Sequence, residues 1–117
     1  MKVYKFGGAS VKDANGVRNL KDIVAQASDD LMVVISAMGK TTNALERVVA
    51  ALAKDDESTA ENEWLGILDQ HVYIMRDLGL RPNEDVRLPL MPEYNKEWSY
   101  DQNYDQIVSL GEIMSTQ

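Results

Sequence analysis

Hydrophobic and polar positions divide the first third of the chain into a strand, a helix and a second strand. An apolar stretch over residues 3–6 ends at two glycines, and a continuous apolar run covers residues 31–35. The length and β-branched content of the second run are typical of a strand buried on both faces in a parallel sheet. Between them, three- and four-residue apolar spacing predicts an amphipathic helix over residues 13–28, with Asp13 as N-cap. This order is a βαβ unit.

Helical spacing continues through the middle of the chain. It predicts a helix over residues 44–54, where Asn43 and Glu46 stand in the positions of a capping box. A longer helix is expected to start at Ser58 and to end with Gly79 as its C-cap. The chain after the second strand is therefore expected to be mainly helical.

The last third combines an irregular segment with one more predicted helix. Residues 81–98 contain three prolines and are expected to be irregular or only briefly helical. Ser99 and Gln102 form another possible capping box, and the helix that follows continues to Gln117 without a capping Gly or Pro. Two strands fall short of the roughly five or six of an average sheet. We therefore expect a mostly helical α/β fold with a short parallel strand pair, in a chain that stops before its fold does.

Composition narrows the class of protein. The chain has 117 residues, of which 44% are apolar and 26% charged. These proportions are those of one ordinary globular domain. It has no Cys, which excludes disulfides and thiolate metal sites. No apolar run approaches the roughly 20 residues that span a bilayer, and the N-terminus does not resemble a signal peptide. A cytoplasmic location is therefore expected.

Charge separates the two halves of the chain. The net charge of −7 makes nucleic acid or an anionic membrane an unexpected partner. Residues 1–54 carry 8 basic and 5 acidic residues, a balance of +3, whereas residues 55–117 carry 4 and 14, a balance of −10. On charge alone, an anionic ligand is expected to prefer the first half.

Two glycines after the first predicted strand are the first candidate site. Gly7 and Gly8 let the backbone approach a ligand and offer N–H groups to phosphate oxygens. The helix that follows is expected to direct its N-terminal dipole to the same space, and Lys5 adds a positive charge. The spacing matches neither the dinucleotide fingerprint nor the Walker A motif. The alternative is a plain Gly-Gly turn beside a surface lysine.

The loop after the second strand is the second candidate. Residues 36–43 are rich in glycine and hydroxyl side chains and occupy the equivalent position. Ligands of open α/β sheets bind outside the carboxyl ends of the strands, so Ser36 and Thr42 are expected to line the same crevice. The alternative is that Thr41, Thr42 and Asn43 only cap the next helix.

Gly111 and Glu112 stand out within the last predicted helix. Gly in a helix interior costs about 1 kcal/mol relative to Ala, so close packing against another backbone or a ligand should compensate. Glu112 is either a ligand for an ammonium group or a solvated carboxylate. His71, the only histidine, is expected to be packed rather than to bind a ligand. No His, Asp or Glu cluster has the spacing of a metal site.

Three segments, in order, resemble aspartate kinase (aspartokinase), of the amino-acid kinase superfamily. They are residues 5–11 (KFGGASV), residues 34–39 with 42–43 (VISAMG and TN), and residues 109–115 (SLGEIMS). The similarity extends over the chain and looks like the monofunctional, lysine-sensitive type. It implies that residues 1–117 are the N-terminal part of the αβα sandwich of the superfamily, a carbamate kinase-like fold. By the same resemblance, the nucleotide half of the domain and the regulatory ACT domains are absent.

The resemblance also implies a reaction. The family transfers the γ-phosphoryl group of ATP to the β-carboxylate of L-aspartate, the first step towards lysine, threonine and methionine, with Mg²⁺ carried by the nucleotide. The residues that match the family motifs are catalytic and phosphate-binding Lys5, phosphate-binding Gly7, Gly8 and Ala9, and aspartate-binding Ser36, Thr42 and Glu112. Gly111, without a side chain, would let its helix approach the substrate. The family usually has Thr where this chain has Ala9, so one hydroxyl is lost while the backbone donors remain.

Several expectations and alternatives complete the sequence-based picture. Because the resemblance implies that the nucleotide half is absent, we expect no activity from the chain alone. Because a half-sheet leaves apolar surface uncovered, we expect self-association or a homo-oligomer. The first and third matching segments together argue against another superfamily member, one that acts on glutamate, carbamate or a nucleotide. The alternative from a different class is a non-catalytic small α/β domain that binds an anionic metabolite or a protein partner.

Overall fold

The fold is a short parallel strand pair followed by helices. The computed structural model describes residues 1–28 and 30–117. In chain order its elements are β1 (Lys2–Phe6), the 3₁₀ turn η1 (Gly8–Val11), α1 (Ala14–Ala25), β2 (Leu31–Ile35), α2 (Thr41–Ala53), α3 (Glu57–Asp77), α4 (Tyr100–Val108) and α5 (Leu110–Thr116). The expected mostly helical α/β fold with a short parallel strand pair is confirmed.

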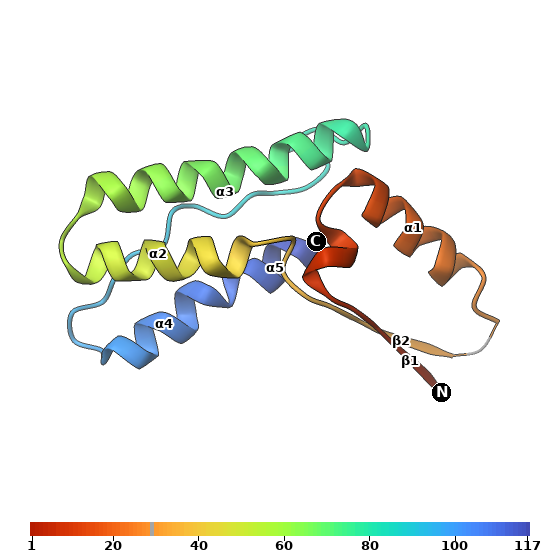
Figure 1. Cartoon of the computed structure of the whole chain (residues 1–117), viewed down its shortest axis with the longest axis horizontal. Helices are drawn as coiled ribbons and strands as arrows, with labels where there is room; N and C mark the ends of the chain where they lie inside the picture. The colour runs from red at the N-terminus through yellow and green to blue at the C-terminus, as the bar shows by residue number, and fades with distance from the viewer. Residues whose placement is uncertain (29) are drawn as a thin grey trace.

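The strand pair is covered on one side. β1 and β2 run parallel, in register from Lys2 opposite Leu31 to Phe6 opposite Ile35, and α1 runs along one face of the pair (Figure 1). The other face leaves apolar side chains exposed: Val3 58%, Met32 49% and Val34 42%. The prediction that β2 is buried on both faces is therefore wrong for the described chain, because no described element covers this second face. Self-association through such surface stays a prediction.

The hydrophobic core lies between the helices, away from the sheet. It joins α2 to α3, α4 and α5 through Leu45, Val48, Val49, Trp64, Ile67, Ile107 and Met114. The three- and four-residue spacing on α2 places one apolar stripe against its neighbours, and each fully buried side chain of this size contributes about 1.5–3 kcal/mol. No helix within the described residues has the length and apolar character that a membrane span requires.

Three of the predicted helix boundaries are confirmed. Asp13 caps α1 by accepting a hydrogen bond from the Gly16 N–H at 2.8 Å. Ser99 and Gln102 form the expected capping box at the start of α4. Gly79 follows the last residues of α3 with a φ of +79°. This left-handed conformation suits glycine at the end of a helix. Local sequence signals are sufficient at these three places.

Two predicted caps are wrong. α2 begins after Lys40, so Asn43 lies within the helix. Glu46, the expected partner of Asn43 in the capping box, instead accepts a hydrogen bond from the Tyr104 hydroxyl at 2.7 Å. That bond to a carboxylate raises the pKa of Tyr104. α3 likewise begins before Ser58, because Asp56 accepts from a backbone N–H and caps the helix first.

The last predicted helix is divided. The chain leaves α4 at Ser109, whose hydroxyl donates to the Gln106 carbonyl at 3.0 Å, and α5 follows as a separate short helix. Gly111 is thus the second residue of α5 rather than the middle of a long helix. In the first turn of a short helix, Gly111 has a smaller helix-interior cost than the sequence suggested.

The irregular segment over residues 81–98 is confirmed, and it runs back along α2 and α3 in an extended form (Figure 1). Its end is fixed by Asn103, which is only 1% exposed on α4. The Asn103 amide accepts from the Asn95 N–H at 2.7 Å and donates to the Asn95 and Ser99 carbonyls, both at 2.9 Å. One side chain therefore joins the segment to the helix.

We predict that Asn103→Ala lowers the free energy of unfolding by about 1–3 kcal/mol, because the Asn95 N–H loses its hydrogen-bond partner and the Asn95 and Ser99 carbonyls each lose one of two. Urea unfolding followed by circular dichroism measures the change. Gln106→Ala, which removes an exposed amide from the same helix, is the matched control. Its effect should stay within about 0.5 kcal/mol. Equal effects of the two substitutions would contradict the role given to Asn103.

Candidate functional site

The turn after β1 and the loop after β2 lie directly against each other. The Ser36 N–H donates to the Phe6 carbonyl at 2.9 Å, and the Gly39 N–H donates to the Gly8 carbonyl at 3.1 Å. A Cβ at Gly8 would lie 2.9 Å from the Gly39 oxygen and 3.0 Å from the Ala37 oxygen. The structure thus brings the two glycine-containing segments to one edge of the sheet, as parallel pairing predicts.

The two glycines of the first turn have different roles. Gly8 has no room for a side chain, whereas nothing lies within 4 Å of a Cβ at Gly7, and Gly7 has an ordinary φ of −76°. Gly8 and Ala9 begin η1, so their N–H groups have no partner within that turn. The expected dipole of the following α-helix is not beside them, because η1 intervenes and α1 starts at Ala14.

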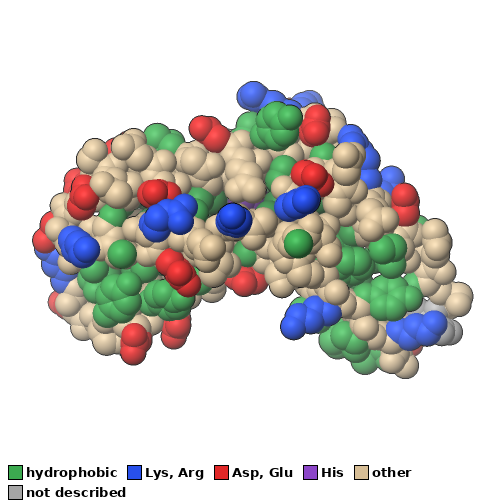
Figure 2. Space-filling view, viewed as in Figure 1, with side chains coloured by type: hydrophobic (Ala, Val, Ile, Leu, Met, Phe, Trp, Pro, Cys, Tyr) green, Lys and Arg blue, Asp and Glu red, His purple; other side chains and the backbone are tan. Residues whose placement is uncertain are grey.

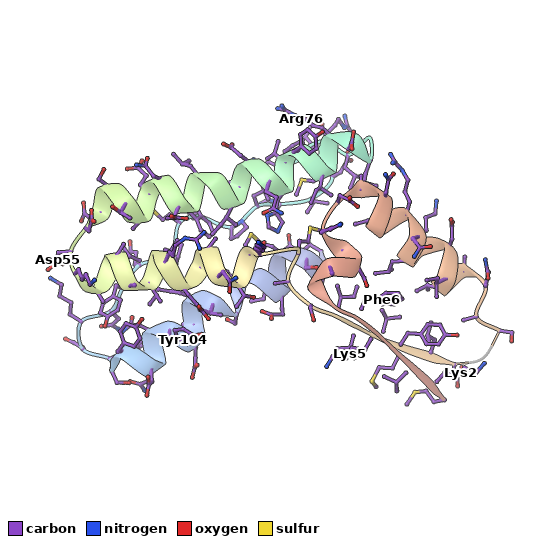
Figure 3. All side chains as sticks on the ribbon, viewed as in Figure 1. Lys2, Lys5, Phe6, Asp55, Arg76 and Tyr104 are labelled. Carbon is purple, nitrogen blue, oxygen red and sulfur yellow. The ribbon has the colours of Figure 1, made fainter. Side chains whose placement is uncertain are left out.

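Lys5 lies on β1, opposite Val34, and its side chain is exposed. Figure 3 shows it pointing away from α1, on the side of the sheet opposite to Phe6. Figure 2 shows that the molecular surface is hollowed on this side, between the strand pair and the α4 end of the molecule. Lys5 forms no ion pair within the described residues, so its charge is available to a ligand.

The hydroxyl groups of the second loop separate into two kinds. Thr41 is fully buried, and its hydroxyl donates to the Met38 carbonyl at 2.6 Å, which closes the loop. Ser36 and Thr42 are half-buried, and neither side chain has a hydrogen bond within the described part of the chain. Thr41 is therefore structural, and Ser36 and Thr42 keep their hydroxyls for a ligand.

Gly111 holds α5 against the same loop. A Cβ there would lie 2.8 Å from the Ala37 Cβ, 3.3 Å from Leu45 Cδ1 and 3.5 Å from Thr41 Cγ2. Close packing against the loop thus compensates for the missing side chain of Gly111. Packing against another backbone is one of the two reasons expected for a glycine here, and binding of a ligand is the other. Glu112, the next residue, is exposed on α5, and no described residue forms an ion pair with it.

Sequence reasoning missed two neighbours of this loop. Gly39 has a φ of +53°, and a Cβ there would lie 3.2 Å from Gln70 Nε2 and 3.7 Å from Lys12 Cβ. Gln70 comes from α3, far away in the sequence, and no local pattern indicates that it reaches the loop. Lys12, an exposed cation directly after η1, could have been noticed as a second basic residue near the glycines.

These pieces assemble into a site for a charged, polar ligand. One edge of the sheet gathers Lys5, backbone N–H groups and the hydroxyls of Ser36 and Thr42, with the Glu112 carboxylate on the adjoining α5; none of these three kinds of side chain has a partner in the part of the chain that the structure describes. α2 is a helix of 13 residues, and its N-terminal end adjoins the second loop. The positive end of its dipole therefore adds to the loop. Such an arrangement suits an anion and an amino-acid zwitterion held side by side.

Comparison with known proteins identifies the family of this chain. The family model described as "Amino acid kinase family" matches residues 1–117. The chain belongs to the amino acid kinase family. It is similar to aspartokinase 1, chloroplastic, and aspartokinase 2, chloroplastic, of Arabidopsis thaliana, each at 31% identity over 97% of this chain. An aspartokinase of Corynebacterium glutamicum is 45% identical over 43% of this chain and 13% of its own length.

The amino acid kinase chain spans only 22% and 23% of the two plant relatives. Their names therefore describe whole proteins that are much longer than this chain. The comparisons establish the family and agree with the α/β fold. The roles of single residues in this chain rest on the geometry given above.

The two glycines of the first turn provide a matched test of this geometry. We predict that Gly8→Ala lowers the free energy of unfolding by about 1–3 kcal/mol, because its Cβ meets two backbone oxygens that are part of the second loop. Gly7→Ala has open space around it. Its effect should stay within about 0.5 kcal/mol. Denaturant unfolding and amide NMR shifts of residues 36–39 measure both. Unchanged loop shifts in Gly8→Ala would contradict the contact.

His71 packs behind this site, as expected from its apolar neighbours. It is 2% exposed, and its Nδ1 lies 2.8 Å from the Ile67 carbonyl. Burial lowers the pKa of His71, because a desolvated imidazolium is disfavoured more than the hydrogen bond to Ile67 favours it.

We predict a pH-dependent stability from this group. The unfolded chain takes up a proton near pH 6.5 while the folded chain resists it, so His71 lowers stability as the pH falls below about 6.5. Urea unfolding at about pH 7.5 and about pH 5.5 measures the loss. His71→Phe should lose less stability than the unsubstituted chain between these values. An equal loss in both would show that carboxylates alone cause it.

Proposed function

We propose that this chain is the N-terminal part of the catalytic domain of an aspartokinase. The proposed reaction transfers the γ-phosphoryl group of ATP to the β-carboxylate of L-aspartate. The observation that carries the proposal is the contact of the Gly8 turn with the loop over residues 36–39, next to the strand that carries Lys5, which forms no ion pair within the described residues. The names of the similar proteins support the choice of substrate.

The proposed chemistry needs charge neutralisation more than proton transfer. A carboxylate oxygen of aspartate attacks the γ-phosphorus, the bond from phosphorus to the bridging oxygen of ADP breaks, and ADP leaves with that electron pair. The nucleophile is already an anion, so no general base is required. The barrier is the approach of two anions, which Lys5 and Mg²⁺ carried by ATP would lower.

The remaining residues position the substrates. The N–H groups of Gly7, Gly8 and Ala9 are proposed to bind phosphate oxygens, where the absence of a side chain at Gly7 leaves open space. Ser36 and Thr42 would hydrogen-bond aspartate, and Glu112 would hold the α-ammonium group of the same substrate. Holding both reactants in line supplies much of the acceleration in such reactions.

The chain alone is proposed to be inactive. Residues 1–117 offer an aspartate side and a phosphate turn, and the adenine side is proposed to come from further sequence in the longer protein. The cytoplasmic location and the homo-oligomer remain predictions of the same kind. The competing class, a non-catalytic domain that binds an anionic metabolite, requires binding without turnover.

We predict that Lys5→Ala lowers the aspartate-dependent activity of the longer protein by about 10²–10³-fold, because one charge on the transferring phosphoryl group is lost. Hydroxylamine trapping of the acyl phosphate, with ATP and aspartate present, measures the rate. Lys54→Ala is the matched control, because Lys54 lies at the other end of α2 from Thr41. The helix rise separates these two residues by about 20 Å. The control should leave the rate unchanged.

Three results would contradict the proposal. A longer protein that binds aspartate or phosphate without forming acyl phosphate would support the non-catalytic domain instead. A Lys5→Ala protein with the rate of the Lys54→Ala control would remove Lys5 from the chemistry. Turnover with glutamate in place of aspartate would assign the chain to another branch of the family.

A further inference from the structure

A cavity lies behind the loop over residues 36–39, which contributes Met38 to its lining. Its volume is about 200 Å³, and its walls come from α1, α3, α5, the loop after β2 and the residues that follow α3. Met38, Met75 and Met114 line it, together with aliphatic side chains of the same elements. No Asp, Glu, Lys or Arg side chain is among the described residues that line it. A charged ligand would therefore lose its hydration without gaining a partner.

Two buried polar atoms at this cavity have no partner within the described residues. They are His71 Nε2 and Ser115 Oγ, and both residues line the cavity. The Ile67 carbonyl can only accept, so Nδ1 of His71 carries the hydrogen and Nε2 is left as a bare acceptor. An unpaired buried acceptor destabilises a fold by an amount similar to a lost hydrogen bond, and each such group requires a reason.

The walls indicate the shape of an occupant. An engineered apolar cavity of about 150 Å³ in another protein stays dry and binds benzene. The volume here, about 200 Å³, suits one aromatic ring with a small substituent. Methionine sulfur makes favourable contacts with aromatic rings, and three of the six methionines of the chain meet here. The apolar walls thus favour a single ring over a cluster of water molecules.

We propose that this cavity binds a neutral, single-ring aromatic molecule that carries one hydroxyl group, of the phenol class. Its hydroxyl donates to His71 Nε2 and accepts from the Ser115 hydroxyl, so one group satisfies both unpaired atoms. A small adjustment of the two side chains exposes these atoms to the ligand. The proposal is independent of the phosphoryl-transfer function, because none of its residues belongs to that chemistry.

The methionines provide the test. We expect phenol, added to the chain carrying ¹³C-methyl methionine, to shift the methyl signals of Met38, Met75 and Met114 in a saturable way. Met1, Met32 and Met91 lie outside the cavity lining and serve as internal controls. Shifts of all six signals, or of none, would overturn the proposal.

Ligand and protein variants test the hydroxyl contact separately. Benzene should bind at least about five- to tenfold more weakly than phenol, because each hydrogen bond that it cannot form contributes about that fold-change, and benzoate should not bind. In His71→Phe, the preference for phenol over benzene should fall, because only the Ser115 hydroxyl is left for the ligand; if this variant does not fold, Ser115→Ala should reduce the preference instead. Equal binding of phenol and benzene to the unsubstituted chain would refute the assignment of Nε2.

Discussion

The close approach of three backbone segments is the constraint on which the arrangement depends. The Gly8 turn, the loop at Ala37 and the start of α5 at Gly111 contact one another at distances that leave no room for a Cβ at either glycine. At these contacts the segments lie close together because the two glycines have no side chain. A side chain added at either glycine would push the segments apart. Lys5, Ser36 and Glu112, which are distant in sequence, owe their common neighbourhood to this packing.

The packing also brings residues from the two oppositely charged halves of the chain to the candidate site. The half with a balance of +3 supplies Lys5 and the glycine turn, and the half with a balance of −10 supplies Glu112. A negative domain would repel an anionic nucleotide at long range. A cation at the end of β1, free of ion pairs in the described chain, therefore changes the local field beside the glycine turn proposed to bind phosphate.

The sequence predicted those features that local physical chemistry determines. Asp13 and Ser99 cap their helices because no other group competes for their side chains. Asn43 is not the cap because α2 already begins at Thr41, and its expected partner Glu46 is bound to Tyr104, 58 residues away, which no local pattern contains. The close packing of Gly111 could be expected from its cost, but its partner Ala37 could not. The first two motifs meet because parallel strands bring their carboxyl ends together.

The loop after β2 separates the two sites. Ala37 packs against Gly111, Ser36 keeps a free hydroxyl on the candidate site, and Met38 lines the cavity behind. One short stretch of backbone thus forms a wall shared by the two sites, with Ser36 and Met38 only two residues apart. Thr41 closes this wall by its bond to Met38. The position of this backbone is fixed by its contacts with Gly8 and Gly111 and by the Thr41 hydrogen bond, so both sites depend on the same three contacts.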